Sequence, residues 1–478
     1  MPHSILDYGA NTDELCTAEI QQAIDACHEA GGGTVLVPAG TYSCGTLVLK
    51  SHVNLHLEPG SVLLGSPNRD HYLKTFRRHG ILYAEDAEHV SVTGTGVVDG
   101  NSPGNYDPTR NHDSADWDTS FTRQGDDYLP PDTFHVDGPI YRKFNLGMTV
   151  TFYFCSHVVL RDFTLKNAPT WAVRFGTCEN ILADNVTILN DLCVPNSDGI
   201  HCTASRNVRI VNCDIRAGDD AIIVSGFEPN ERLDRVIAPV EERPFGNKAP
   251  VSEHVCVSNC HLVSRSSGIR IGYGPYPIRR LSFSNLQIYD SNRGIGIYAR
   301  EEAPIEDVFF DNITIETRLL DGTWWGHGEP IHLSTVPRFE GRPSAPIRRV
   351  RFSNILAEAE QGVLLWGREG ACLEDIRFQQ LRLRIKNGPM VTATGGNFDL
   401  RPAADPAHSL FAHDCPGLYA RHIDGLQLMD VEVLWDEDLP EFYTHGLHAV
   451  CVQALEQVRC KFAANPAATR AEAVKIEA

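Results

Sequence analysis

The chain has 478 residues, with 42% hydrophobic and 22% charged side chains, a balance that is ordinary for a globular protein. Its formal net charge of −20 argues against nucleic acid or an anionic membrane as a partner, because both carry negative charge themselves. For the same reason, a polyanionic substrate would need local Arg or Lys side chains to hold it.

The first residues contain no basic segment followed by an apolar run, and nowhere do 18 apolar residues follow one another. We therefore expect no secretory signal, no membrane span and a cytoplasmic location. The 14 Cys are dispersed without any Cys-x-x-Cys pair, which in an intracellular protein is typical of small buried hydrophobic residues. Cys256 and Cys260 could bind a metal, but no Cys or His pair lies at the matching zinc spacing, so the sequence predicts neither a metal nor a cofactor.

Residues 14–30 have apolar side chains at helical spacing and are followed by three glycines, a pattern that predicts a helix with a defined end. Short apolar segments at 34–38, 45–49 and 53–57, divided by turn residues, predict strands directly after it. A helix in front of short strands could cover the open end of a column of stacked strands. Residues 97–147 are rich in Asp, Asn, Pro and Tyr, and we interpret them as a long insertion over one face.

From residue 156 onwards a five-residue frame recurs, in which apolar residues alternate with others and the last position is most often Asn. The last positions are Asp162, Asn185, Asn212, Asn259, Asn285, Asn312, Asn354 and Gln380, with successive differences of 23, 27, 47, 26, 27, 42 and 26. Strand alternation that repeats about every 25 residues predicts a parallel β-solenoid, an all-β fold in which each coil hydrogen-bonds to the next. We expect the Asn side chains to form a ladder at an inward turn.

The two long differences indicate one coil plus an insertion, at about 225–250 and 317–346. On this interpretation residues 1–463 form one solenoid domain, since the alternating frame reappears at 426–430. The Ala- and charge-rich residues 464–478 are interpreted as a C-terminal tail, either a short helix or a frayed end.

Three acidic residues fall into one structural period: Asp198 and the pair Asp219 and Asp220, with 219 − 198 = 21. They are expected at different points of two adjacent coils, flanking one sheet corner, and a strand spacing of about 4.8 Å would bring them into one cluster. When three carboxylates lie so close together, keeping all of them ionised costs free energy, so the pKa of at least one should rise. A neutral acid beside charged bases is what glycoside hydrolysis needs, although Asp clusters also bind Ca²⁺.

The Asn-x-Asp motif at 196–198 and the Gly-Asp-Asp motif at 218–220 resemble those of glycoside hydrolase family 28, which contains polygalacturonases and rhamnogalacturonan hydrolases. The resemblance extends over most of the chain. It implies a right-handed parallel β-helix and hydrolysis with inversion at the anomeric carbon. It also implies that Asp219 is the general acid and that Asp198 and Asp220 hold and deprotonate the water.

Two further motifs of that family are altered in this chain. The family's Gly-His-Gly motif should fall near 266–272, where Ser267 stands in place of the His. Its Arg-Ile-Lys motif should fall at 294–298, where Gly296 and Tyr298 replace both cations. In the family these cations are expected to hold the carboxylate of galacturonate. Their loss, together with the net charge of −20, argues against galacturonate at the cleavage subsite.

Two explanations of the missing cations stay open. Either Arg270 and Arg300 substitute from shifted positions, or the sugar at the cleavage subsite is neutral, such as rhamnose; we favour the neutral sugar. The long insertions could close one end of a cleft, and a cytoplasmic enzyme would meet short imported oligosaccharides. We therefore expect an exo-acting hydrolase of pectin-derived or related plant oligosaccharides. The linkage and the oligomeric state stay open.

Further side chains are candidates for contact with the substrate. Aromatic rings can stack on sugar faces, a Glu in an insertion can accept hydrogen bonds from sugar hydroxyls, and a His close to the acidic cluster can contact it. Each of them could equally be a packed structural residue. The candidates are Asn196, His201, Ser267, Arg270, Tyr273, Tyr298, Arg300, Trp324, Trp325 and Glu329.

Two other functions compete with hydrolysis. A uronate lyase or epimerase on the same fold would want a Lys or Arg base, usually with Ca²⁺, and no basic residue adjoins the Asp cluster in the sequence. A non-catalytic carbohydrate-binding solenoid would have no need of three clustered acidic residues. An inverting glycosidase fits the sequence better than either.

Overall fold

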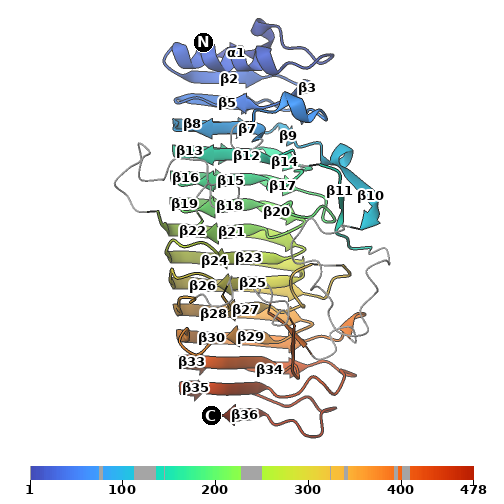
Figure 1. Cartoon of the computed structure of the whole chain (residues 1–478), viewed down its shortest axis with the longest axis vertical. Coiled ribbons are helices and arrows are strands. Elements are labelled where there is room, and N and C mark those ends of the chain that lie inside the picture. The colour runs from blue at the N-terminus through green and yellow to red at the C-terminus, as the bar shows by residue number, and fades with distance from the viewer. Residues whose placement is uncertain are drawn as a thin grey trace.

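The alternating apolar frame forms parallel strands, and their stacking builds a column that runs the length of the molecule (Figure 1). The computed structural model describes residues 2–74, 79–111, 136–144, 146–227, 250–322, 324–337, 343–391, 397–400 and 410–478. The two termini lie at opposite ends of the column (Figure 1). The fold is a right-handed parallel β-helix, which confirms the predicted fold class.

Three sheets run along the column, and each strand pairs with the equivalent strands of the coils before and after it. Sheet 1 consists of β4 (Leu47–Val48), β7 (His79–Glu85), β12 (Met148–Tyr153), β15 (Val173–Gly176), β18 (Ile200–Thr203), β21 (Ile222–Ser225), β23 (Ser267–Gly272), β25 (Arg293–Tyr298), β27 (Ile331–Ser334), β29 (Val363–Trp366), the first parts of β33 (Leu418–Met429) and β35 (Leu447–Val458), and β36 (Val474–Glu477).

Sheet 2 consists of β1 (His3–Ser4), β2 (Gly33–Val37), β5 (Val53–Leu57), β8 (Glu88–Gly94), β13 (Ser156–Arg161), β16 (Glu179–Asp184), β19 (Arg206–Val211), the first parts of β22 (Ser252–Ser264), β24 (Ile278–Ser291), β26 (Ile305–Thr317), β28 (Ile347–Ala359) and β30 (Leu373–Ile385), and the second parts of β33 and β35. Sheet 3 consists of β3 (Gly40–Cys44), β6 (Ser61–Gly65), β9 (Val97–Asp99), β14 (Thr164–Lys166), β17 (Thr187–Leu189), β20 (Asp214–Ala217), the second parts of β22, β24, β26, β28 and β30, and β34 (Glu432–Trp435).

Helix α1 (Thr17–Glu29) covers the N-terminal end of the column, inside the predicted range 14–30 (Figure 1). It ends where a Cβ on Gly32 (φ 103°) would lie only 2.5 Å from the backbone oxygen of His52, so no other residue fits there. The other described helices are short 3₁₀ turns: η1 (Ile5–Tyr8), η2 (Arg69–His71) and η3 (Ser102–Asn105). None of the helices in the described ranges is long and apolar enough to cross a membrane.

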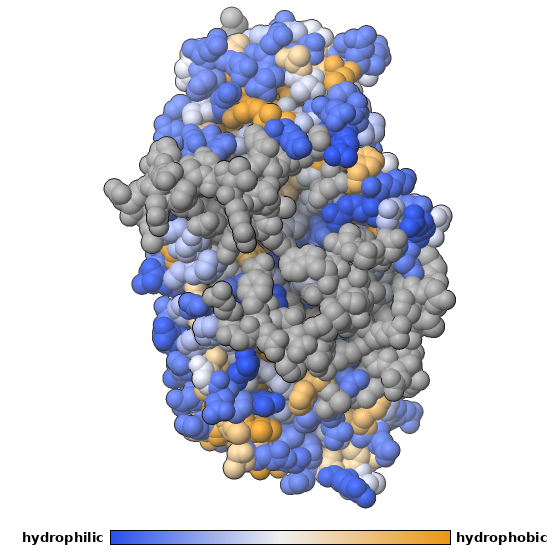
Figure 2. Space-filling view, in the orientation of Figure 1, coloured by the Kyte–Doolittle hydropathy of each residue, from blue (hydrophilic) through white to orange (hydrophobic). Residues whose placement is uncertain are grey.

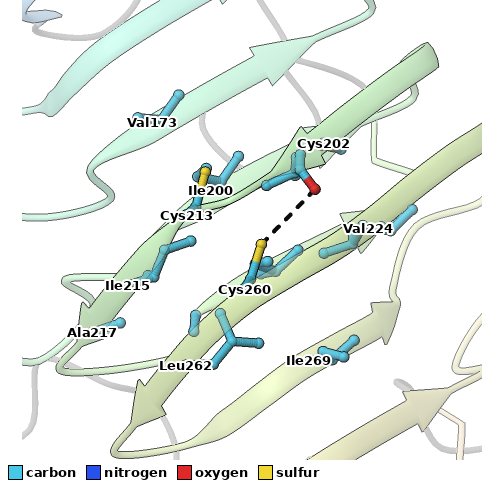
Figure 3. Close-up of a cluster of buried hydrophobic side chains, with 14 of the residues drawn as sticks. Val173, Ile200, Cys202, Cys213, Ile215, Ala217, Val224, Cys260, Leu262 and Ile269 are labelled. Carbon is cyan, nitrogen blue, oxygen red and sulfur yellow. Dashed lines mark hydrogen bonds between the residues drawn. The ribbon is translucent and has the colours of Figure 1, made fainter. Parts of the chain in front are cut away.

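The interior is filled by side chains that point inward from all three sheets and stack on their equivalents in the next coil. One such stack runs through four coils, with ring centroids 4.9, 4.9 and 4.7 Å apart, and consists of Phe283, Phe310, Phe352 and Phe378. All fourteen cysteines are free thiols and nine are buried. Cys202, Cys213 and Cys260 lie among Ile, Val and Leu side chains (Figure 3). Cysteine therefore serves here as a small hydrophobic residue, as predicted.

The recurring Asn residues lie at the corner between sheets 2 and 3, where they bend the chain. Their φ angles are positive, at 57° for Asn259, 56° for Asn285 and 55° for Asn312, a conformation that Asn tolerates better than most residues. Asn285 Nδ2 donates to Asn259 Oδ1 at 3.3 Å, and Asn312 Nδ2 donates to Asn285 Oδ1 at 2.8 Å. The ladder therefore forms, but the prediction that it faces inward is wrong. These side chains are exposed, because the apolar positions of the frame occupy the interior.

We expect replacement of Asn285 by Ala to lower the free energy of unfolding by about 1–2 kcal/mol, because Ala disfavours the left-handed conformation and makes no ladder hydrogen bond. Asn285→Gly accepts a positive φ and should lose less. Urea unfolding of the two variants measures the difference. Equal losses would mean that the hydrogen bonds, and not the backbone conformation, explain the Asn.

The predicted insertions leave the column between strands, except that the range 317–346 is too long, because β27 within it pairs in sheet 1. Because β9 still pairs within sheet 3, the first insertion begins after Asp99 and not at residue 97. Its described part forms an antiparallel hairpin of β10 (Tyr106–Asn111) and β11 (Ile140–Arg142) beside the column (Figure 1). Residues 112–135 of this insertion and 228–249 of the next lie outside the described residues. A second antiparallel pair joins β31 (Asn397–Asp399) to β32 (Leu410–Ala412).

The C-terminal residues contribute to the column. Strand β36 pairs in parallel with β35, so the residues expected to be a short helix or a frayed end add a further strand to sheet 1. The reason is that its apolar and charged residues alternate with the period of a strand. On the face seen in Figure 2 the described surface is mostly hydrophilic, with hydrophobic residues visible mainly towards the two ends.

Candidate active site

The acidic residues singled out in the sequence lie on the outward face of sheet 1, near the middle of the column. Asp198 precedes Ile200 by two residues, Asp220 precedes Ile222 by two residues, and these two Ile are paired across β18 and β21. Asp198 and Asp220 therefore occupy equivalent positions on adjacent coils, which corrects the expectation that they lie at different points. Counting from the Asn frame misplaced them because the turn before β18 is longer than the turn before β21.

The three carboxylates form one cluster. An oxygen of Asp198, one of Asp219 and one of Asp220 all lie within 4.8 Å of one another. Asp198 and Asp220 are each 3% exposed, whereas Asp219 is half-buried. Of the three, Asp219 is thus the carboxylate that a molecule on the outside of sheet 1 reaches most easily.

Each carboxylate has a different set of partners. Asp198 Oδ2 lies 2.8 Å from His201 Nε2. Asp220 Oδ1 accepts from the Ser267 N–H at 2.9 Å, and Asp220 Oδ2 accepts from Arg270 Nε. Asp219 accepts from the Asp220 N–H at 2.8 Å and from Asn196 Nδ2 at 3.3 Å. The guanidinium next to Asp220 holds that carboxylate in place and offsets one negative charge of the cluster.

This donor set fits a calcium ion poorly. Ca²⁺ takes roughly six to eight oxygen ligands. Both oxygens of Asp220 already accept from N–H groups, one of them from the cationic Arg270, which a cation would have to displace.

Burial raises the pKa of Asp198 well above its ordinary value, and the negative charges of Asp219 and Asp220 raise it further, while the charge of Arg270 opposes the rise. Asp198 therefore keeps its proton to a higher pH than an ordinary Asp does. The sequence-based expectation that one pKa of this cluster rises agrees with this direction. The site thus holds a buried carboxyl group with a raised pKa next to two further carboxyl groups.

We expect the variant Asp198→Asn to gain stability over the natural chain as the pH rises. A native pKa above the unfolded value of about 3.9 means that the native state binds more protons between the two values, so stability falls as pH increases through that window. The amide does not titrate and escapes this loss, which has a slope of at most about 1.4 kcal/mol per pH unit. Melting temperatures at pH 4 and pH 8 measure it. A difference between the two proteins that does not grow with pH contradicts the raised pKa.

On the N-terminal side of the cluster the sheet carries aromatic and cationic side chains. Trp171 stacks on His201 with ring centroids 3.5 Å apart and an interplanar angle of 9°. Arg174 pairs in register with His201, and its guanidinium lies 5.2 Å from the Trp171 ring. Sequence reasoning missed Trp171 and Arg174. The sequence did contain a signal for Trp171. Val173 pairs with Ile200, and Trp171 precedes Val173 by two residues just as Asp198 precedes Ile200, so Trp171 takes the position of Asp198 one coil earlier.

On the C-terminal side, strands β23, β25 and β27 carry buried polar atoms that have no hydrogen-bond partner. Such atoms are costly unless a ligand or water satisfies them. Within the described residues of these three strands and the turn after β23, they are Ser267 Oγ, Arg270 Nη1, Tyr273 OH, Tyr298 OH and His332 Nε2.

These groups are neutral apart from Arg270, whose charge faces Asp220. Burial raises the pKa of Tyr273 and of Tyr298 above the ordinary tyrosine value. Burial and the charge of Arg293 lower the pKa of His332. This side of the cluster therefore offers neutral hydrogen-bonding groups.

Glycine at position 296 makes room for the ring of Tyr298. A Cβ on Gly296 would lie 2.5 Å from Tyr298 OH and 2.6 Å from its ring, so this ring lies across the glycine. The Tyr298 ring also meets the His332 ring edge-on, with centroids 5.2 Å apart. An aromatic ring thus fills the surface where a longer side chain at position 296 would stand.

A second ionic group lies further along the same face. Arg293 donates to Glu329 Oε1 through Nε at 2.8 Å and Nη2 at 2.6 Å, and His332 Nδ1 lies 3.2 Å from the same oxygen. All three residues are at most 1% exposed. Burial alone would raise the pKa of Glu329, but the charge of Arg293 and the hydrogen bond with His332 outweigh it and lower the pKa. Glu329 is therefore ionised and held by protein groups.

The remaining predicted contact residues occupy different environments. Arg270 and Arg300 both lie over the ring of Tyr273, at 4.3 and 4.9 Å. Trp324 is buried, and its Nε1 donates to the backbone oxygen of Asp137 at 3.3 Å. Trp325 is half-buried and packs against the aromatic cluster of Phe227, Tyr273 and Tyr298.

Comparison with known proteins gives one family. The family model described as glycosyl hydrolases family 28 matches residues 27–238. An exopolygalacturonase of Oenothera organensis is 24% identical over 261 residues, which cover 52% of this chain and 64% of that protein. An exo-poly-alpha-D-galacturonosidase of Dickeya chrysanthemi is 27% identical over 254 residues, covering 46% of this chain and 41% of that protein. The chain thus spans less than two thirds of the length of these two relatives.

Solved structures share the fold. The family 28 exopolygalacturonase of Yersinia enterocolitica superposes with a TM-score of 0.63 at 16% sequence identity, covering 96% of this chain and 78% of that chain. At this identity the similarity shows the parallel β-helix.

Proposed function

Because residues 27–238 match the family model of glycosyl hydrolases family 28, we propose that the protein is a glycosidase of this family that hydrolyses pectin-derived or related plant oligosaccharides. The observation that carries the proposal is the cluster of Asp198, Asp219 and Asp220. One oxygen of each lies within 4.8 Å of the others, and the pKa of Asp198 is raised. The relatives named exopolygalacturonase favour an exo-acting enzyme, which takes units from one end of a chain.

In this proposal Asp219 is the general acid and Asp198 and Asp220 act on water. Asp219 gives its proton to the glycosidic oxygen as the bond to the anomeric carbon breaks, and the water oxygen attacks that carbon while its proton passes to a carboxylate. The half-buried position of Asp219 supports this role, because the leaving oxygen must reach the acid. The proton retained by the coupled cluster can reside on Asp219 at that moment.

Inversion at the anomeric carbon is part of the proposal. The spacing of the cluster, within 4.8 Å between oxygens, is shorter than the roughly 6.5–9.5 Å usual between the two carboxyl groups of inverting enzymes. However, both oxygens of Asp220 accept hydrogen bonds from protein groups, which makes this carboxylate a poor nucleophile. Proton NMR of the first product formed decides the point. Initial retention would assign the nucleophile to Asp198, whose Oδ1 has no partner.

We further propose that the sugar at the cleavage subsite is neutral, for example rhamnose. Arg270 is paired with Asp220, and Arg293 is paired with Glu329. The polar atoms of Tyr298 and His332 that have no partner are uncharged. If instead galacturonate binds here, Arg300, which shares the ring of Tyr273 with Arg270, is the cation that would hold it.

A screen of defined oligosaccharides with mass detection tests the proposal. Pairs that differ only in a neutral sugar or a uronate at the non-reducing end are incubated with the protein, and the released unit is weighed. In hydrolysis the masses of the two products add up to the mass of the substrate plus one water. In elimination they add up to the mass of the substrate alone. An unsaturated, ultraviolet-absorbing product would identify a lyase and end the hydrolase proposal. Faster release of the uronate would replace the neutral-sugar part alone.

A further inference from the structure

The proposed reaction leaves His332 and Glu329 without a function. Arg270, Gly296 and His332 are in register on β23, β25 and β27. His332 therefore stands two strand spacings from Arg270, or roughly 10 Å, with only the Gly296 backbone and the overlying Tyr298 ring between them. It belongs to the same outward face as the acidic cluster, further towards the C-terminus.

The partners of His332 decide which of its nitrogens carries the proton. Glu329 is ionised, because Arg293 and His332 lower its pKa, and an ionised carboxylate can only accept hydrogen bonds. His332 Nδ1, which lies 3.2 Å from Glu329 Oε1, must therefore be the protonated nitrogen. Burial and the charge of Arg293 lower the pKa of the ring, so it is neutral. His332 Nε2 is then a bare lone pair, an acceptor only.

This acceptor is buried and has no donor. His332 is 0% exposed, and no described group donates to Nε2. One hydroxyl that also has no partner belongs to the ring beside it, Tyr298 OH, whose ring meets His332 edge-on at 5.2 Å. A second, Tyr273 OH, belongs to the next ring, 6.1 Å from that of Tyr298. A fixed acceptor next to hydroxyls that both donate and accept is complementary to the hydroxyl groups of a neutral sugar.

A carboxylate does not suit the same place. It offers no hydrogen to the lone pair of Nε2, so the two electron-rich groups cannot pair. A site whose polar groups are aligned for a hydroxyl rejects a group that cannot complete the hydrogen bond, because the buried acceptor then stays unpaired.

We propose that His332 is a specificity-determining residue that accepts a hydrogen bond through Nε2 from a hydroxyl of a neutral sugar and disfavours a uronate at that subsite. Glu329 and Arg293 are positioning residues, which fix the tautomer of the ring and keep it neutral. The inference rests on the proposed function, since it assigns a sugar class to the same cleft.

Binding measured by calorimetry tests the proposal on a background of Asp219→Asn, which slows cleavage of the ligand. The ligands are oligosaccharides that differ only in a neutral sugar or a uronate at one unit. His332→Phe keeps a ring against Tyr298 and removes the acceptor, and we expect it to lower the preference for the neutral ligand about five- to tenfold. His332→Gln, whose amide oxygen restores an acceptor, should recover most of that preference. His448→Phe, another buried histidine of sheet 1 outside the site, is the matched control and should leave the preference unchanged.

An unchanged preference in His332→Phe overturns the inference and leaves the glycosidase proposal intact. Absence of binding and of turnover for every ligand of both kinds overturns both. Nitrogen NMR of the imidazole provides a readout that packing alone would not give. The resonance lost in His332→Phe should show protonated Nδ1 and bare Nε2, and Nε2 should shift when the neutral ligand binds. A protonated Nε2 contradicts the proposal, and the resonance lost in His332→Gln assigns His332 where His332→Phe fails to fold.

Discussion

Replacing Asp219 with Asn is expected to lower the turnover of oligosaccharide by about 10²–10⁴-fold, the usual contribution of a general acid. The amide keeps the size of the carboxyl group and can still accept from the Asp220 N–H, but it loses the hydrogen bond from Asn196 Nδ2 and has no proton to give to the leaving oxygen. The carboxyl group of Asp219 lies within 4.8 Å of those of Asp198 and Asp220, so the loss of one charge also eases the repulsion that retains the shared proton. The substitution should therefore lower kcat with little effect on binding.

Steady-state kinetics and calorimetry together measure this result. Asp424→Asn, which changes an exposed carboxylate on β33, is the matched control and should leave kcat unchanged. A variant at Asp219 with normal kcat would remove the assigned acid. In that case the protonated group would have to be Asp198, whose pKa is raised by burial and by its two neighbours.

Replacing Arg293 with Met is expected to lower the free energy of unfolding by about 3–5 kcal/mol, the cost of leaving one partner of a buried ion pair without the other. Arg293 and Glu329 are both 1% exposed, and two N–H groups of Arg293 donate to one oxygen of Glu329. Without the guanidinium, the carboxylate of Glu329 stays buried with only His332 and a backbone N–H as partners.

The pH dependence of this loss has a definite sign. The native pKa of Glu329 lies below its unfolded value of about 4.3, so the stability that it contributes is present above that value and is lost as the pH falls. The defect of Arg293→Met should therefore be largest near neutral pH and shrink in acid, where the carboxyl group can take up a proton.

Urea unfolding at neutral and acidic pH measures both effects. The double variant Arg293→Met with Glu329→Gln removes the buried charge and should recover part of the stability. Arg459→Met serves as the exposed control, since its partner Asp430 and Arg459 itself are 33% and 65% exposed, and it should cost at most about 1 kcal/mol. Equal losses at Arg293 and Arg459 would mean that the buried pair has no special importance.

The two sides of the acidic cluster differ in a way that bears on substrate orientation. Towards the N-terminus the sheet presents Trp171 stacked on His201, a planar surface with Arg174 beside it. Towards the C-terminus it presents Tyr273, Tyr298 and His332, with free hydrogen-bonding atoms. A sugar chain that lies along the column would thus meet a stacking surface on one side of the scissile bond and hydroxyl-binding groups on the other.

The sequence by itself determined the column and the meeting of Asp198 with Asp220. Its apolar frame repeats with a nearly constant period, and in a parallel stack equal periods place equivalent residues one strand spacing apart. This is why the fold class could be predicted before any contact was known. The pairing of Ile200 with Ile222, 22 positions apart, did not follow from a period near 25, because it depends on the lengths of the turns before β18 and β21.

The partners of the charges were decided only by the tertiary structure. Arg270 is 50 residues from Asp220, and Glu329 is 36 residues from Arg293. Each pair spans an insertion whose length hides the coil count. The Asn ladder shows the same limit, since the spacing predicted that its members stack but not that they lie outside. Periodicity indicates which residues stack on one another in successive coils. It does not indicate which neighbour a side chain bonds or whether that side chain faces the interior or the solvent. Those depend on turn lengths and on packing that only the assembled coils provide.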